Sequence, residues 1–168
     1  MKDVTKCIDK FSGDYAFLSN FYWEPCGTCV EIKFQAAKAR HDPELRAKIL
    51  NASTPGKAKR LGREVSLDRK WWAKECGSIM YQALLTKFFD PVLREKLLAT
   101  GEAVLIEGNY WHDNYWGNCM CKRDECSPLG HNHLGLLLME VRTHYVDYER
   151  MLDDPLYVRD KDIDSIVE

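Results

Sequence analysis

The feature that most constrains the fold of this chain is a long helical periodicity between Asp68 and Phe89. Its apolar side chains recur mostly at three- and four-residue spacings, which places them on one face of an α-helix: Trp72, Ile79, Met80, Ala83, Leu84 and Phe88. Residues 133–151 repeat the pattern with Leu134, Leu137, Leu138, Val141, Tyr145 and Tyr148. The sequence therefore predicts two long helices that turn these faces toward the core.

Shorter helices are predicted along the rest of the chain. They are residues 30–38, 43–51 and 55–62, and a segment that starts at Asp90-Pro91 and ends at Gly101. Ser53 or Thr54 is placed to cap the third of them, with Pro55 in its first turn. A glycine in the position of Gly101 is common just after a helix. These signals indicate a mostly helical chain.

Only short stretches are predicted to form strands. The aromatic-rich sequence FSGDYAFLSNFYW, residues 11–23, predicts a short strand and a turn, and AVLIEG, residues 103–108, predicts a buried strand. Residues 1–10 are predicted to be a loose lead-in or an edge strand. Residues 109–132 lack periodicity and are dense in Gly, Asn, Asp, Cys and aromatic residues. A long loop of this composition is predicted to be functional.

Length and charge limit which classes of protein this chain can belong to. A chain of 168 residues fits one domain with its own core, and we predict that domain over residues 1–150 and an acidic tail over residues 151–168. The net charge of −2 and the pI of about 6.2 argue against a protein whose whole surface binds nucleic acid or membranes. The sequence has no membrane-length apolar run and no signal-peptide pattern, so we expect a cytoplasmic protein without a membrane partner.

The predicted helix VEIKFQAAK, residues 30–38, carries a row of polar side chains. Glu31, Gln35 and Lys38 are four and three residues apart, so they share one helix face. Glu31 and Lys38 are separated by about 10 Å along the axis. A sugar or nucleotide could lie along this row, with a carboxylate at one end and an amine at the other. The alternative is a solvated helix face with spaced charges.

Three acidic residues are candidates for acid–base chemistry: Glu31, Glu107 and Asp113. Glu107 ends the predicted strand, and Asp113 lies near Trp116 in the loop of residues 109–132, hereafter the aromatic loop. A carboxyl group among aromatic rings tends to have a raised pKa. Cleavage at an anomeric carbon needs a negative charge, a positioned water and an acid for the leaving group. These residue types are the parts needed to attack an N-glycoside, and Trp or Tyr can stack on a nucleobase.

Two further polar groups allow two interpretations each. The pair Ser19-Asn20, inside an apolar run, is either a turn or a pair of hydrogen-bonding groups in an aromatic-walled pocket. A basic stretch is either a solvated surface or a phosphate clamp; it contains Lys57, Lys59, Arg60 and Arg63.

The seven cysteines are predicted to be reduced thiols, because the chain shows no export signal. Buried, inert thiols are the default. The alternative is a structural zinc site built from the pairs Cys26-x-x-Cys29 and Cys119-x-Cys121 together with Cys126, with His131 and His133 following. The irregular spacing of these residues leaves the zinc question open, so we assign neither a metal nor a cofactor.

An ordered series of motifs between about Phe11 and Arg142 resembles the NADAR (YbiA-like) family. The motifs are FLSNFY, VEIKFQAAKA, KAKRLGREV, the long helix with Trp71 and KFF, LLATGEAVLIEG, DNYWGN and GHNHLGLLLMEVR. The resemblance implies a compact, mostly helical α+β single domain. The loop after Trp116, however, holds CMCKRDEC at residues 119–126, in place of the W-G-x-G continuation that is more common in the family.

The resemblance also implies an N-glycosidase. Family members act on riboflavin-pathway intermediates or remove ADP-ribose from guanine bases. We therefore expect an enzyme that removes ADP-ribose from ADP-ribosylated guanine in DNA, RNA or a nucleotide, a form of nucleic-acid repair or de-modification. The alternatives are hydrolysis of riboflavin-pathway ribosylamino-pyrimidine phosphates, and a non-catalytic module that binds ADP-ribose or NAD.

Matched to the family motifs, the expected catalytic residues are Glu31, Lys38 and Asp113. The expected substrate-binding residues are Asn20, Phe21, Gln35, Arg63, Trp116, Gly117 and Asn132. Asp113 or Glu31 is expected to stabilise the oxocarbenium and orient water. Lys38 is expected either to protonate the leaving base or to attack C1 as an amine. Trp116 is expected to stack on a base.

Overall fold

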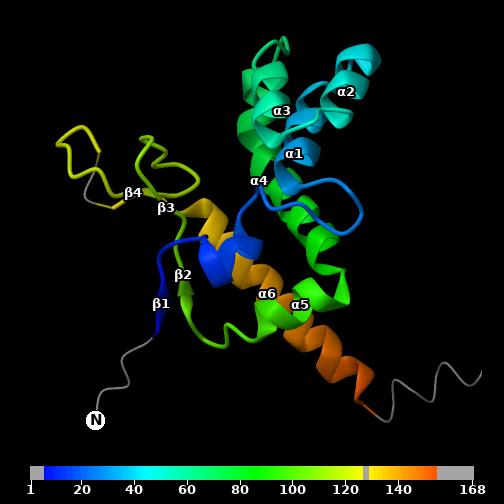
Figure 1. Cartoon of the computed structure of the whole chain (residues 1–168). Coiled ribbons are helices and arrows are strands. Elements are labelled where there is room, and N and C mark those ends of the chain that lie inside the picture. The colour runs from blue at the N-terminus through cyan, green and yellow to red at the C-terminus, as the bar shows by residue number, and fades with distance from the viewer. Residues whose placement is uncertain (1–5, 127–128, 155–168) are drawn as a thin grey trace, which may run out of the picture.

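In a computed structural model of the chain, the structure describes residues 6–126 and 129–154. Figure 1 shows a mostly helical molecule with small β elements on one side. The helices are α1 (Val30–Lys38), α2 (Pro43–Leu50), α3 (Pro55–Gly62), α4 (Arg69–Phe88), α5 (Pro91–Leu98) and α6 (His133–Leu152), with the 3-10 helix η1 (Gly13–Leu18). The predicted helices and the predicted mostly helical α+β class are confirmed.

Local capping explains where most of these helices begin. Asp42, Thr54 and Asp90 cap α2, α3 and α5, and each is followed by a proline at the start of its helix. Asp68 caps α4 by accepting hydrogen bonds from the backbone N–H groups of Lys70 and Trp71. A side-chain oxygen at this position satisfies N–H groups that have no partner inside the helix.

Two apolar clusters support the helices. The main cluster joins α4, α5 and α6 to η1 and the short strands; its fully buried members include Leu18, Leu84, Phe88, Leu134 and Leu138. A smaller cluster lies among α1, α2 and α3; its buried members include Cys29, Ile32, Ala36, Ile49 and Ala58. α1 packs against α2, α3 and α4, so it is held from several sides.

The strands are short parallel pairs. β1 (Cys7–Ile8) pairs with β2 (Val104–Leu105), so only part of the predicted strand 103–108 forms β2. β3 (Gly108–Asn109) pairs with β4 (Asn118–Cys119), so two short strands form within and beside the predicted loop of residues 109–132. Glu107 lies between β2 and β3, where the chain passes from one pair to the other.

The strand predicted in residues 11–23 was wrong, because the chain forms η1 there. Ser12 is extended and Gly13 has a φ of 57°, a left-handed conformation that glycine adopts at little cost. The backbone N–H of Tyr15 then donates to the carbonyl of Ser12 at 3.1 Å. Turn chemistry at Ser12-Gly13 therefore outweighs the strand preference of the aromatic residues that follow.

α6 ends at Leu152, so the boundary predicted at residue 150 falls within the last turn of this helix. Residues 155–168 of the predicted acidic tail lie outside the described residues. Within the described ranges, no helix combines the length and the apolar character needed to cross a bilayer.

Candidate active site

The polar row on α1 is buried at its first two positions. Glu31 is 5% exposed and Gln35 is 4% exposed, so these side chains do not form a solvated helix face. Gln35 Nε2 donates a hydrogen bond to Glu31 Oε1 at 2.8 Å, which fixes the orientation of the carboxylate. Lys38, the last residue of the helix, is half-buried. A buried carboxylate one turn from a buried amide is therefore the base of the candidate site.

Asn20 anchors the start of α1. Its backbone carbonyl accepts a hydrogen bond from the N–H of Glu31 at 3.0 Å. Its side-chain Nδ2 lies 3.5 Å from the Met80 sulfur, and among the described residues its buried Oδ1 has no hydrogen-bond partner. A buried oxygen without a partner is able to accept a hydrogen bond from a ligand. The adjacent Phe21 is exposed, and Lys59 Nζ lies 5.9 Å from its ring centroid.

α3 brings positive charge to the site because it packs closely on α1. Gly62 makes this approach possible: a Cβ at this position would lie 2.0 Å from Gln35 Oε1. Lys59 is half-buried on this helix, and Arg63 follows its last residue as an exposed side chain. Of the basic stretch identified in the sequence, Lys59 and Arg63 are thus the two cations whose charges act on the α1 row.

The aromatic loop contributes Asp113 in a fixed position. The side chain of Asn109 bonds twice to the Asp113 backbone, once to its N–H at 3.1 Å and once to its carbonyl at 2.7 Å. Asp113 Oδ1 in turn accepts from the backbone N–H groups of Tyr115, at 3.1 Å, and Trp116, at 2.9 Å. One carboxylate oxygen therefore shapes the loop, and Oδ2 is the oxygen available for chemistry.

Aromatic rings join the loop to α1 and α4. The Phe34 ring centroid lies 4.9 Å from that of Trp72 and 5.3 Å from that of Trp116. Lys38 Nζ lies 5.2 Å from the Trp72 ring centroid. Trp116 and Lys38 thus lie on the two sides of one aromatic row, in which Phe34 is buried and the half-buried Trp72 and Trp116 can offer flat surface to a planar base.

Burial shifts the pKa values of the α1 groups. Burial raises the pKa of Glu31, while the hydrogen bond from Gln35 and the charges of Lys59 and Lys38 oppose the rise. Burial lowers the pKa of Lys38, and the negative charge of Glu31 opposes this change. The protonated form of the carboxyl group is therefore more favourable than on an exposed glutamate, and the neutral form of the amine is more favourable than on an exposed lysine.

Glu107 is a site residue that the sequence prediction considered but left out. Burial, followed by the charges of Asp113 and Glu31, raises its pKa to about 7. Because the charge of Asp113 acts on both Glu31 and Glu107, and that of Glu31 acts on Glu107, carboxyl groups from three separate segments lie near one another here. Its position at the end of an apolar strand was the available signal. Lys59, which also acts on Glu31 and Glu107, was visible only as one cation of a basic stretch.

Asn132 and Gly117 hold the backbone of Glu107. Asn132 Oδ1 accepts from the Glu107 N–H at 3.0 Å, and its Nδ2 donates to the Leu105 carbonyl at 2.9 Å. A Cβ on Gly117 would lie 2.2 Å from the Glu107 carbonyl oxygen. In this structure both residues position Glu107, and the predicted contacts of both with substrate remain predictions.

A cavity of about 310 Å³ opens at the C-terminal end of α1. Lys38 lines it, together with Arg40 and Trp71, whose ring the Arg40 guanidinium covers at 3.8 Å. Glu31 is not among the residues that line it, so the cavity meets the polar row at Lys38 alone. Lys38 therefore connects this cavity to the carboxylate cluster.

Comparison with known proteins matches most of the chain. The model of the NADAR domain matches residues 10–145. The chain is similar to the riboflavin biosynthesis protein PYRR, chloroplastic, of Arabidopsis thaliana, with 36% identity over 105 residues, 59% of this chain and 16% of the plant protein. It is similar to Protein irg-1 of Caenorhabditis elegans, with 33% identity over 126 residues, 68% of this chain and 59% of the nematode protein.

Among solved structures, the fold is similar to the NMR structure of the Escherichia coli protein YbiA. The TM-score is 0.69 at 31% sequence identity, covering 88% of this chain and 92% of the bacterial one. The chain thus matches nearly the whole bacterial structure but spans a small part of the plant protein and about three fifths of the nematode protein.

Proposed function

The chain belongs to the NADAR domain family, and from this premise we propose that it is an N-glycoside hydrolase that removes ADP-ribose from ADP-ribosylated guanine in DNA, RNA or a nucleotide. Family membership and the riboflavin-pathway name of the plant relative support a glycosidase-like role. The observation that carries the proposal is the convergence of Glu31, Glu107 and Asp113 with the amine of Lys38.

The carboxyl groups divide the acid and base roles. As the N-glycosidic bond breaks, C1 of the ribose gains positive charge, and the departing base gains negative charge. An ionised Asp113 or Glu31 stabilises C1 and orients the attacking water. With a pKa of about 7, Glu107 keeps a substantial protonated fraction near neutrality and is suited to donate a proton to the base.

Lys38 offers a second route to the same products. Burial lowers its pKa, so the neutral amine is more available than on an exposed lysine. The amine attacks C1, the base leaves with a proton, and opening of the ribose ring gives an imine between C1 and Nζ. Water then hydrolyses the imine and releases the sugar. Reduction with borohydride during turnover separates the routes, because only this one leaves a covalent adduct on Lys38.

Groups around the carboxylates suit a nucleotide substrate. Lys59 and Arg63 bring positive charge, and pyrophosphate oxygens are natural partners for such cations. The half-buried Trp72 and Trp116 rings, which pack on either side of the buried Phe34, provide aromatic surface for a base. A substrate with two phosphates and two bases uses both features, which favours an ADP-ribosyl group over a ribosyl group with a single phosphate.

Hydrolysis of a riboflavin-pathway ribosylamino-pyrimidine phosphate is the second candidate, favoured by the printed name of the plant relative. It breaks the same kind of bond with the same carboxylates. A module that binds ADP-ribose or NAD without turnover is the third. The candidates differ in which compound is consumed, so a single assay compares them.

The test is a mass-spectrometric assay with ADP-ribosylated guanosine, ADP-ribosylated DNA and a ribosylamino-pyrimidine phosphate. Asp113→Asn is the informative variant, because its side-chain oxygen still accepts the Tyr115 and Trp116 N–H bonds while the charge is removed. Glu44→Gln, on the exposed start of α2, is the matched control. Release of ADP-ribose by wild type and control, but not by Asp113→Asn, supports the proposal. Binding of ADP-ribose without turnover of any substrate contradicts it.

A further inference from the structure

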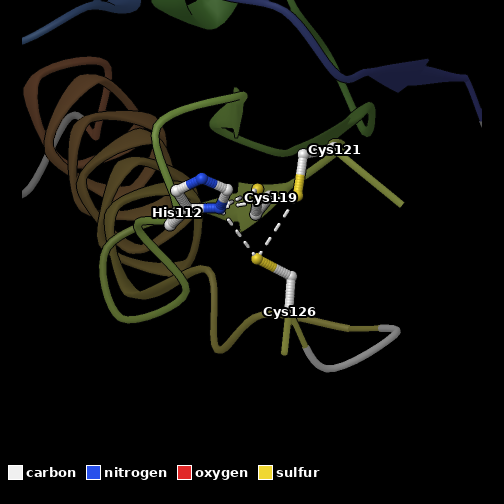
Figure 2. A group of neighbouring side chains, drawn as sticks. All are labelled: His112, Cys119, Cys121 and Cys126. Carbon is white, nitrogen blue, oxygen red and sulfur yellow. Dashed lines mark hydrogen bonds between the residues drawn. The ribbon is translucent and has the colours of Figure 1, made fainter. Parts of the chain in front are cut away.

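The aromatic loop holds a cluster of metal-ligand side chains outside the candidate active site. Four potential ligand atoms lie within 4.8 Å of one another: Nδ1 of His112 and Sγ of Cys119, Cys121 and Cys126. Figure 2 shows these side chains pointing toward a common centre. The sequence pattern had grouped other residues with these cysteines and had not included His112.

The separations of these atoms match the edges of a zinc tetrahedron. With Zn–S near 2.3 Å and Zn–N near 2.0 Å, tetrahedral geometry puts two sulfurs about 3.8 Å apart and a sulfur and a nitrogen about 3.5 Å apart. His112 Nδ1 lies 3.1 Å from the Cys126 sulfur, 3.8 Å from that of Cys119 and 3.5 Å from that of Cys121. The sulfurs of Cys121 and Cys126 are 3.4 Å apart, well beyond the length of a disulfide bond.

We propose that this cluster, hereafter the Cys₃His site, binds one zinc ion as a closed structural site. Thiolates and imidazole are the ligands that zinc prefers, and four protein ligands leave no position for a substrate or a reactive water. Three thiolates and a neutral imidazole neutralise the ion and leave one negative charge.

The remaining cysteines and histidines named in the sequence prediction have other surroundings. Cys26 lies in the turn before α1, where its sulfur is 3.6 Å from a Glu24 carboxylate oxygen, and Cys29 is the buried residue that precedes that helix. His131 and His133 stack on each other with ring centroids 5.6 Å apart. The ligand set is therefore local to residues 112–126.

The backbone around the Cys₃His site is already shaped for ligation. His112 and Lys122 have φ values of 66° and 58°, left-handed conformations that non-glycine residues adopt at a cost. Asn114 Oδ1 accepts from the N–H of Cys119 at 2.9 Å, which fixes one ligand strand. A bound ion would offset the conformational cost of these two backbone positions. In this segment only Trp116 packs against the main apolar cluster, so hydrophobic packing stabilises the rest of it little.

The ion would also brace the candidate active site. His112 immediately precedes Asp113, and Cys119 follows the Trp116-Gly117 pair by two residues. One zinc ion therefore ties together both ends of the segment that carries Asp113 and Trp116. The proposal that zinc binds here does not depend on the proposed hydrolase function. Only the expectation that loss of zinc would reduce turnover rests on that function.

The experiment is metal analysis of the full chain, purified under reducing conditions without chelators from zinc-containing medium. Inductively coupled plasma mass spectrometry should find about one zinc per chain. Cys121→Ser should lose most of this zinc. Cys26→Ser, at an exposed cysteine outside the cluster, should keep it. Because zinc content is measured directly, the result does not depend on whether any substrate is hydrolysed.

Cobalt substitution of the wild-type chain keeps the proposal testable if Cys121→Ser does not fold. Replacement of zinc by Co²⁺ should produce the intense visible bands of a tetrahedral site together with thiolate-to-cobalt charge transfer. Wild-type protein that holds no zinc and gives no tetrahedral cobalt spectrum would overturn the proposal. Equal loss of zinc from Cys26→Ser and Cys121→Ser would overturn the assignment of the ligands.

Discussion

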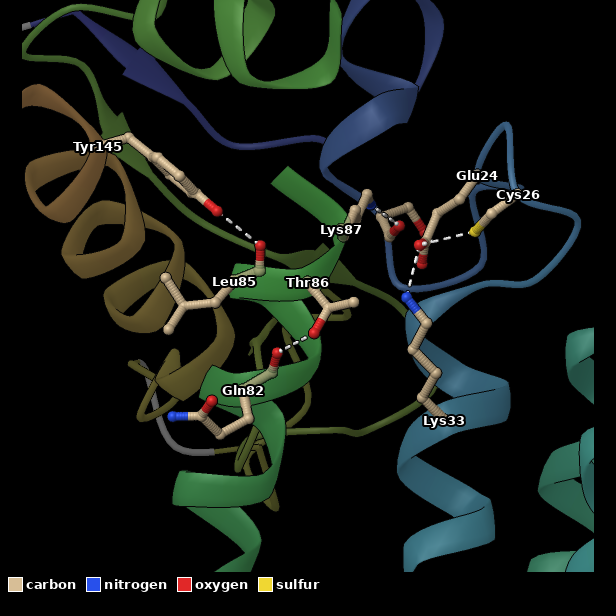
Figure 3. Close-up of polar contacts among 9 residues, drawn as sticks. Glu24, Cys26, Lys33, Gln82, Leu85, Thr86, Lys87 and Tyr145 are labelled. Atoms are coloured by element: carbon tan, nitrogen blue, oxygen red, sulfur yellow. Dashed lines mark hydrogen bonds and ion pairs between the residues drawn. The ribbon is translucent and has the colours of Figure 1, made fainter. Parts of the chain in front are cut away.

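Two groups of charged side chains lie around α1, and they differ in the exposure of one lysine: Lys87 is enclosed, whereas Lys38 is half-buried and lines a cavity. The closed group contains Glu24, Lys33 and Lys87, and the open group contains Glu31, Lys38, Glu107 and Asp113. In the closed group Lys87 is 1% exposed, its Nζ donates to the Ser19 carbonyl at 2.8 Å, and the Tyr22 ring lies 5.6 Å away. Figure 3 shows Lys87 beside Glu24, which is paired with Lys33 and contacted by Cys26.

A shifted pKa does not by itself mark a catalytic residue. Burial lowers the pKa of Lys87 to about 7, a large shift, yet the side chain is enclosed by protein. Lys38 also has a pKa lowered by burial, but it lines a cavity beside an aromatic row. Access distinguishes a structural lysine from a candidate catalytic one.

The largest expected difference between the two groups is in turnover. Glu31→Gln removes the charge in the open group but keeps a side chain that can bond to Gln35, so we expect activity to fall about 10²- to 10⁴-fold with little loss of stability. Glu24→Gln, the same change in the closed group, should leave the turnover of folded protein unchanged and lower the free energy of unfolding. Steady-state kinetics and urea unfolding on both variants measure this contrast. Equal activity in the two variants would contradict it.

The next effect is on how stability changes above neutral pH. The pKa of Lys87 is about 7 in the folded chain, against 10.5 for an ordinary lysine, so between these values the unfolded chain binds more protons. The free energy of unfolding should therefore rise with pH, by roughly 2 kcal/mol between about pH 7 and about pH 9. Lys87→Met should lack this rise. Urea unfolding at several pH values tests it, and parallel curves for the two proteins would exclude it.

Glu107, in the open group, should give the opposite slope at lower pH. Its pKa is about 7 in the folded chain against 4.5 for an ordinary glutamate, so here the folded chain binds more protons. The free energy of unfolding should therefore fall as pH rises from about 5 to about 7, by roughly 1 kcal/mol once screening of this partly exposed group is allowed for. Glu107→Gln should flatten this slope in the same unfolding series. A variant that retains the wild-type slope would assign it to another group.

The smallest expected effect on turnover comes from reducing the aromatic surface at Trp116. Trp116→Phe keeps a ring against Phe34 but reduces the area available to a base, so we expect kcat/KM to fall several-fold, about 1 kcal/mol in transition-state binding. Trp23→Phe, at an exposed tryptophan outside the aromatic row, is the control. Initial rates at several substrate concentrations separate binding from rate. An unchanged kcat/KM would remove Trp116 from the base-binding role.

Much of the helical framework was predictable because its signals are local. The caps at Asp42, Thr54, Asp68 and Asp90 act on N–H groups two or three residues away, so the chain carries them wherever it folds. The NADAR resemblance is likewise confirmed by the match over residues 10–145. The 3-10 helix was missed because aromatic content was weighted above the turn at Gly13.

Spacing within single segments was enough to predict the α-helices, their apolar faces and the polar row Glu31, Gln35 and Lys38. Only the tertiary structure decided that Glu107 joins Glu31 and Asp113, because Asn132, 25 residues further along, holds its backbone in place. Only the structure assigned His112, and neither Cys26 nor Cys29, to the cysteine cluster. These contacts join separate segments through packing and hydrogen bonds, and no local periodicity records which segments will meet.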